Sequence, residues 1–177
     1  MSVEDVEGEG EIYPGFISPK GFDVIPLADL GRLGGLAVLR GMIAGDYPAP
    51  PIARTLSMWI SEVEEGRVVF KGLPARKHCN PLGSVHGGWT ATIMDSALAC
   101  AVMTTLKPGE GYTTAEFKVN LTRPVLPGMG EVFCEGRLLH RGRTLATSEA
   151  FLRDGKGRLL AHGTETCAIF PIESLMR

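Results

Sequence analysis

The sequence predicts an α+β fold in which a curved antiparallel sheet of five to six strands wraps around one long central helix. The helix is indicated by an apolar run over residues 85–106, which ends at the stop signal Lys107-Pro108-Gly109. The strands are indicated by short alternating segments between turn sequences, a pattern typical of an antiparallel meander. Because the helical run is apolar on every side, the helix has to be covered, and a curved sheet covers it most economically.

The N-terminal part of the chain is predicted to lie outside this core. Residues 1–23 are rich in Glu and Gly and poor in apolar residues, so we expect a disordered acidic tail. Residues 24–54 are expected to form a helix over 29–44, with Gly45 as its C-cap, and then an extended proline-rich connector. Residues 55–177 then form the main domain.

The strands of the main domain follow from alternation and turn signals. In the clearest of these strands, residues 114–122, apolar residues at odd positions alternate with polar residues at even positions. We therefore expect one buried face and one solvent-exposed face. Short turns between the segments indicate antiparallel neighbours. The other expected strands are 55–63, 67–73, 131–140, 144–153 and 159–170.

Composition narrows the class of protein. The 177 residues carry a net charge of −2, with 44% hydrophobic and 21% charged residues, which fits one soluble domain with a sizeable core. Without a basic excess, neither nucleic acid nor a membrane is expected as a partner. The four cysteines form no Cys-x-x-Cys pair and the N-terminus lacks signal-peptide features, so we expect reduced thiols in the cytoplasm. No cofactor is expected, and His78, Cys79 and His86 lack the spacing of a zinc site.

A single carboxylate, Asp95, interrupts the apolar helix. It shares a stripe with Ala91 and Leu98, where an unpaired charge is unfavourable, so it is either satisfied by nearby hydrogen bonds or serves a reaction. At the start of the helix, Gly87 and Gly88 either permit tight packing or expose backbone amides to a substrate. Amides of a first helical turn have no intrahelical acceptor and lie at the positive end of the helix dipole, so they can stabilise an oxygen that gains negative charge.

The spacing of these groups predicts a site shared by two subunits. Gly87 and Asp95 are eight residues apart, which is about 12 Å along a helix. One carbonyl group cannot reach both in the same chain. If both act on one substrate, the amide and the carboxylate come from different subunits, whose helices run antiparallel across a two-fold axis. A homodimer is therefore expected.

A resemblance to a known family rests on three segments, NPLGSVHGGWTATIMDSA, TTAEFKVNLTRPV and HRGRTLATSEAFLRDGKGRLLAHGTETC. They resemble the hotdog-fold thioesterases of the phenylacetate-pathway type. The resemblance extends over about residues 56–170, and the spacing Asn-x6-Gly-Gly-x6-Asp is specific. It implies a hotdog fold, a homotetramer built from dimers, and hydrolysis of acyl-CoA thioesters to free acid and CoA.

The resemblance also implies roles for individual residues. The Gly87 amide polarises the thioester carbonyl, and Asp95 from the opposing subunit acts as general base or nucleophile. Asn80 orients water or the carbonyl. A hydroxyl near the carboxylate is expected at Thr114, or at its neighbour Thr113, which would contact the substrate.

Further substrate contacts are expected at both ends of the motif. Gly88 lies beside the substrate, and His86 either hydrogen-bonds near the thioester or caps the loop. The basic hairpin Arg141-Gly142-Arg143 stands where similar proteins hold the phosphates of CoA, although such a hairpin tip can also simply be solvated.

Two other functions remain open on the sequence. A hotdog dehydratase would use His86 as a base opposite Asp95, and a non-catalytic acyl-CoA sensor would keep the fold without the reaction. The acyl group is also open, because Trp89 and Met94 suit either a pocket or the core.

Overall fold

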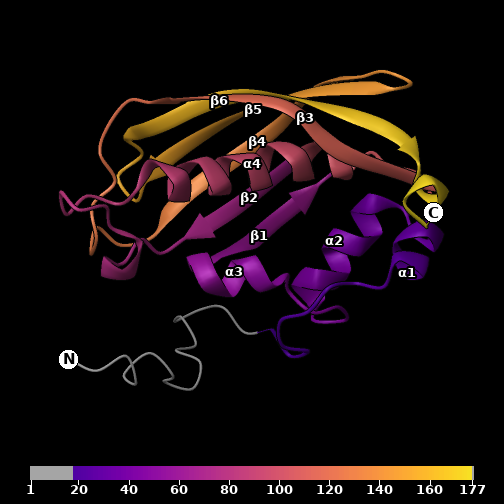
Figure 1. Cartoon of the computed structure of the whole chain (residues 1–177), viewed down its shortest axis with the longest axis horizontal. Helices are drawn as coiled ribbons and strands as arrows, with labels where there is room; N and C mark the ends of the chain where they lie inside the picture. Colours follow the sequence, from indigo (N-terminus) through magenta and orange to yellow (C-terminus); the bar gives the residue numbers. More distant parts are fainter. Residues whose placement is uncertain (1–17, 177) are drawn as a thin grey trace.

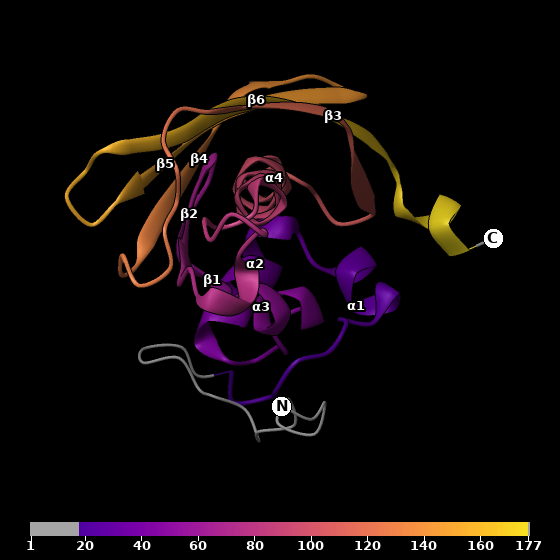
Figure 2. The same cartoon turned by 60° about the vertical axis from the view of Figure 1, so that its left-hand side comes forward.

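The structure is a computed structural model that describes residues 18–176 (Figure 1). A six-stranded antiparallel sheet curves around one long helix, and three shorter helices lie on the other side of that helix (Figure 2). The predicted α+β architecture is confirmed. Residues 1–17 of the predicted tail lie outside the described part. Its last residues are attached to the protein, since Phe22 forms a bridge with Ala49 and the Ala49 amide donates to the Gly21 carbonyl at 3.1 Å.

The sheet has the strand order β1-β2-β4-β5-β6-β3, so β1 and β3 are its edges. All neighbouring strands are antiparallel. A turn at Gly66 joins the first two strands with a φ of 75°, which glycine adopts without strain. The strands are β1 (Met58–Glu64), β2 (Arg67–Gly72), β3 (Glu110–Leu121), β4 (Val132–Arg141), β5 (Leu145–Asp154) and β6 (Leu159–Pro171).

The central helix is α4 (Gly87–Met103). It packs against β2, β4, β5 and β6, where side chains such as Ile93 are fully buried. The fit is close, because a Cβ on Gly136 of β4 would overlap the carbonyl oxygen of Ala97. The side of α4 away from the sheet carries smaller and more polar residues, such as Ser96, that are only partly buried. The expectation of burial on every side is therefore correct only for the side that faces the sheet.

Two residues of α4 could, from the sequence, line either a pocket or the core, and the structure places both in the core. Trp89 is 3% exposed and donates from Nε1 to the Leu56 carbonyl at 2.7 Å, and Met94 is fully buried. Among the helices of residues 18–176, none is both long enough and apolar enough to span a membrane.

The N-terminal helices differ from the prediction. The single helix expected over 29–44 is two helices, α1 (Leu27–Arg32) and α2 (Gly35–Ala44). The chain breaks between them because α2 begins against the end of α4, where the Gly35 amide donates to the Leu106 carbonyl at 3.0 Å and a Cβ would overlap the main chain. The predicted C-cap is confirmed, with Gly45 at a φ of 83°.

The proline-rich connector is only partly extended. Pro51 begins a short helix, α3 (Pro51–Leu56), because proline is well accommodated at a first helical position, where no amide donor is needed. Both α2 and α3 contact β1. The N-terminal helices therefore lie over the side of α4 that the sheet leaves uncovered (Figure 2).

Strand β3 departs from the strict alternation that its sequence predicts. The register against β6 shifts between Thr114 and Glu116, so Ala115 forms a β-bulge. Beyond it, Phe117 and Leu121 of the expected buried face are 41% and 59% exposed. The prediction that this face of β3 is buried is therefore wrong for the isolated chain. An apolar edge strand of this length is a typical site of association with another chain.

Candidate active site

The N-terminus of α4 presents an open backbone amide. His86 is the N-cap, and its Nδ1 accepts a hydrogen bond of 2.9 Å from the Gly88 amide. Gly87 occupies the first helical position, and its amide meets no acceptor among residues 18–176. This amide lies at the positive end of the helix dipole, where it can bind an oxygen that carries negative charge. Of the two roles open to His86, the geometry shows the cap.

Asn80 holds together the loop that leads into α4. Its side-chain nitrogen donates to Ser84 Oγ at 2.9 Å, and its side-chain oxygen accepts from the Leu82 amide at 2.9 Å. A β-bridge between Cys79 and Val85 closes the same loop. The side chain of Asn80 thus supports the entry to the helix, and its action on water or substrate stays a prediction.

Asp95 belongs to a network of side chains from α4, β3 and β6. Thr114 Oγ1 lies 3.3 Å from Asp95 Oδ1 and 3.0 Å from Glu165 Oε1. Cys167 Sγ lies 3.0 Å from the same oxygen of Glu165. Asp95 is partly buried, whereas Glu165 is only 1% exposed. Two carboxyl groups therefore share one hydroxyl.

This sharing leaves two possible directions for the hydrogen bonds, and the position of the carboxyl proton decides between them. The Thr114 hydroxyl has one proton and can donate to only one carboxyl group. If Glu165 is protonated, it donates to Thr114, and Thr114 in turn donates to an ionised Asp95. The Thr114 hydroxyl is then used both as donor and as acceptor, and the Asp95 carboxylate is held in a defined orientation.

The pKa values support this assignment of the proton. Burial, together with the nearby charge of Asp95, raises the pKa of Glu165 to about 7, although the hydrogen bonds that it shares with Cys167 and Thr114 act in the other direction. The second oxygen of Glu165 is buried without a partner in the described part of the chain, which further disfavours its charge. Burial also raises the pKa of Asp95, and the bond from Thr114 lowers it. Glu165 is therefore the group of the pair that stays protonated to the higher pH, and it loses its proton around pH 7.

The bulge in β3 selects the hydroxyl that reaches Asp95. With uninterrupted alternation, Thr114 would face the opposite side from Phe117 and Val119. The extra residue at Ala115 lets both Thr114 and the later apolar residues face α4. Thr113 is exposed and makes no such contact. Of the two neighbouring hydroxyls, the structure brings Thr114 to the carboxylate.

The sequence analysis missed Glu165. Its signal was present, because in β6 the residues Ala161, Gly163, Cys167 and Ile169 alternate as the buried face and Glu165 stands in the same phase. A charged residue at a position where the alternation predicts burial needs a hydrogen-bonding partner or has a functional role.

The remaining predicted residues lie at the other end of α4. The hairpin of Arg141, Gly142 and Arg143 joins β4 to β5, and Ala146 beside it packs with Val102 and Leu106 at the C-terminal end of α4. Arg141 is engaged in an ion pair of 2.7 Å with Glu110, whereas Arg143 is exposed. Within one chain, the hairpin and Gly87 are therefore at opposite ends of the helix.

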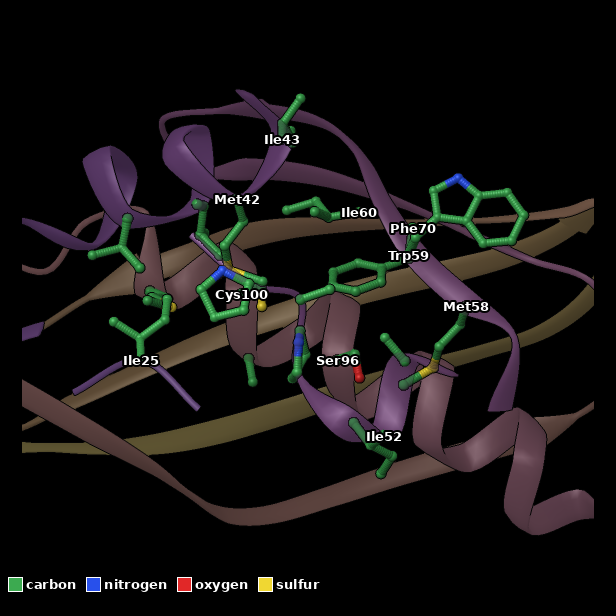
Figure 3. Close-up of a pocket in the computed structure, with 18 of the residues that line it drawn as sticks. Ile25, Met42, Ile43, Ile52, Met58, Trp59, Ile60, Phe70, Ser96 and Cys100 are labelled. Atoms are coloured by element: carbon green, nitrogen blue, oxygen red, sulfur yellow. The ribbon is translucent and has the colours of Figure 1, made fainter. Parts of the chain in front are cut away.

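A cavity of about 640 Å³ lies beside Asp95, between α4 and the N-terminal helices. Figure 3 shows the side chains of Met42 from α2, Ile52 from α3, and Ser96 and Cys100 from α4 around this space. Burial and the carboxyl groups of Glu165 and Asp95 raise the pKa of Cys100 to about 12, so its thiol is not a nucleophile. No three metal-ligating side chains within residues 18–176 come together as a metal site. Asp95 is thus the carboxylate that α4 contributes to the wall of the cavity.

Comparison with known proteins places this geometry in a family. Residues 82–161 match the family model described as Thioesterase superfamily. Human acyl-coenzyme A thioesterase 13 is 30% identical over 103 residues, which are 57% of this chain and 71% of that protein. A candidate esterase of Caenorhabditis elegans is 34% identical over 112 residues, which are 62% of this chain and 64% of that protein, a little under two thirds. A crystal structure of a phenylacetic acid degradation-related protein from Ralstonia eutropha JMP134 is 29% identical with a TM-score of 0.67, and the match covers 73% of this chain and 98% of that one.

The chain belongs to the thioesterase superfamily and has the hotdog fold. Its class is that of the thioester hydrolases. The resemblance seen in the sequence is confirmed at this level.

Proposed function

We propose that this protein hydrolyses acyl-CoA thioesters to the free acid and CoA, in a site that two subunits form together. The observation that carries the proposal is the pair of groups on α4: an open amide at Gly87 and an oriented carboxylate at Asp95. The helix is continuous between them, so they stay about 12 Å apart. The name of the human relative, an acyl-coenzyme A thioesterase, supports the choice of substrate.

In the proposed reaction, the Gly87 amide of one subunit donates to the thioester carbonyl oxygen. Asp95 of the partner subunit either attacks the carbonyl carbon or takes a proton from an attacking water. The carbonyl oxygen gains negative charge, which the amide stabilises, and the bond from carbon to sulfur then breaks. After attack by water, the proton on Asp95 passes to the departing thiolate; after direct attack, water hydrolyses the acyl anhydride.

The assembly follows from the same geometry. The apolar edge of β3, with Phe117 and Leu121 exposed, offers the surface for a two-fold contact. From the resemblance to the phenylacetate-pathway thioesterases, we further propose that two such dimers assemble into a tetramer. The exposed Arg143 in the hairpin is the residue through which CoA phosphates would be held, because Arg141 is already paired with Glu110.

Gly87→Pro tests the amide directly. Proline is favoured at a first helical position and removes only the donor, and His86 before it already has a ψ of 137°, which a residue before proline prefers. We expect kcat to fall about 10² to 10³-fold in an acyl-CoA thiol-release assay. Gly87→Ala is the matched control, because it keeps the amide and its Cβ meets only the exposed Leu121 side chain, at 3.1 Å. Equal activity of the two variants would contradict the role of the amide.

Mixing the variants tests whether the site is shared. Asp95→Asn should also remove most hydrolysis, since it keeps the shape of the side chain but cannot act as base or nucleophile. After complete subunit exchange with Gly87→Pro, half of the dimers are mixed, and each has one complete site, so about a quarter of wild-type turnover should return. If exchange is verified by mass spectrometry and no activity returns, each chain holds its own site and the proposal is wrong.

A further inference from the structure

The cavity beside Asp95 is closed by elements that precede the sheet. We propose that the N-terminal helices α2 and α3 build an acyl chamber that selects aliphatic acyl groups of about eight or more carbons. This inference rests on the proposed thioesterase function, because it treats the cavity as the place for the acyl part of the same substrate. It assigns to residues 35–56 the role of determining specificity.

The position of the chamber links it to the reacting carbonyl. Asp95 and Ser96 form part of its wall from α4, and Met42 and Ile43 of α2 and Ile52 of α3 line the same space. An acyl group whose carbonyl carbon lies at Asp95 can therefore extend directly into this space.

The chemistry of the lining fits an aliphatic chain. Among the described residues that line the chamber, the charged ones are Asp23, Lys71 and Asp95, and Lys71 is paired with Glu131 at 3.2 Å. The rest are mainly aliphatic side chains and methionines, which adapt to a flexible chain. The volume of about 640 Å³ is typical of a ligand site. At roughly 30 Å³ for a methylene-sized group, a chain of about ten carbons would fill half of it.

Comparison with one relative indicates that this chain is longer than the hotdog unit that the two share. The sheet and α4 occupy residues 58–171, and α1, α2 and α3 all precede them. The structure from Ralstonia eutropha matches over 98% of its own length but only 73% of this chain, so about a quarter of this chain has no counterpart there. The N-terminal helices precede the sheet, and contacts of α2 and α3 with β1 hold them in place.

A chain-length series tests the chamber. For the wild-type protein, kcat/KM should rise about fourfold per added methylene from butyryl-CoA to octanoyl-CoA, the factor that corresponds to about 0.8 kcal/mol of burial. Phenylacetyl-CoA should be a poorer substrate than octanoyl-CoA. Equal kcat/KM for butyryl-CoA and octanoyl-CoA, or a preference for phenylacetyl-CoA, would overturn the proposal.

Filling the chamber tests which residues form it. Ala53→Phe, at a buried chamber position of α3, should lower the ratio of kcat/KM for dodecanoyl-CoA over that for acetyl-CoA at least tenfold. Ile43→Trp gives a second variant at a position that is 44% exposed and tolerates bulk. Ala37→Phe adds the same ring to an exposed position of α2 outside the chamber and should leave the ratio unchanged. A ratio that neither chamber variant changes, in protein shown to be folded, would refute the assignment.

A binding measurement separates this inference from the proposed function. In Asp95→Asn, dodecanoyl-CoA should bind at least tenfold more tightly than CoA by titration calorimetry, and Ala53→Phe added to it should remove the difference. If this holds but the wild-type protein hydrolyses no acyl-CoA, the chamber stands and the proposed function fails. If dodecanoyl-CoA binds no more tightly than CoA, the space belongs to another occupant, such as the N-terminal residues or a second copy of the chain, and the chamber is refuted.

Discussion

Replacing Glu165 by Gln should change how the stability of the protein depends on pH. Glu165 is 1% exposed, and burial raises its pKa from a usual 4.5 to about 7. The native state then binds the proton more tightly than the unfolded state, so stability from this group is fully present below pH 4.5 and is lost as pH rises through 7. From these two pKa values, the loss between pH 5 and pH 8 is about 2.5 kcal/mol. Gln stays neutral and keeps a donor toward Thr114, so it should not lose this stability.

Urea unfolding at fixed protein concentration measures the effect. The free energy of unfolding of the wild-type protein should fall by about 2.5 kcal/mol more than that of Glu165→Gln between pH 5 and pH 8. Asp95, whose pKa burial also raises, is present in both proteins, so its contribution largely cancels. Glu65→Gln, an exposed change in the turn between β1 and β2 that is not among the charges acting on Glu165, is a matched control. Parallel pH curves for wild type and Glu165→Gln would show that Glu165 is ionised in the native state, and the assignment of the proton would be wrong.

Two further predictions concern packing and assembly. Gly136→Ala should destabilise the protein by about 1–3 kcal/mol, because the added methyl overlaps the main chain of Ala97 in α4. Gly155→Ala is the control and should be nearly neutral, because the nearest neighbour of its added methyl is 3.9 Å away. Equal unfolding midpoints of the two variants would contradict the close contact. Phe117→Lys should raise the dissociation constant of the proposed dimer about 10² to 10⁴-fold in sedimentation experiments, because a two-fold contact loses the ring twice. Leu139→Lys on β4 is the control, since Leu139 has a similar exposure. A dimer that stays intact in Phe117→Lys would show that β3 is not the interface.

The elements that could be predicted from the sequence are those with local causes. The six strands and α4 follow from periodicity and from turn residues that act over a few positions, as at Gly66 and Gly45. The division of the N-terminal helix could not be predicted in this way. It depends on Gly35 meeting the end of α4, about seventy residues further along the chain, and a local pattern does not contain that contact.

The candidate site shows the same limit. Gly87 and Asp95 could be identified because both lie in one helix, where position fixes geometry. Glu165 lies next to Asp95 only because β3 pairs with β6 and carries Thr114 between them. The spacing along the chain gives no distance between strands that are paired across a sheet, so the second carboxyl group appears only in three dimensions.

The bulge at Ala115 gives β3 one residue that it can lose without turning over either half of the strand. Ala115 is exposed, so many replacements there should be tolerated. Deleting it would remove the bulge and leave an uninterrupted strand in which Thr114 and Phe117 still face the helix while Glu116 and Lys118 stay outside. A residue inserted into β3 beyond the bulge would instead exchange the inside and the outside of the strand's second half, a defect that no substitution within it could repair.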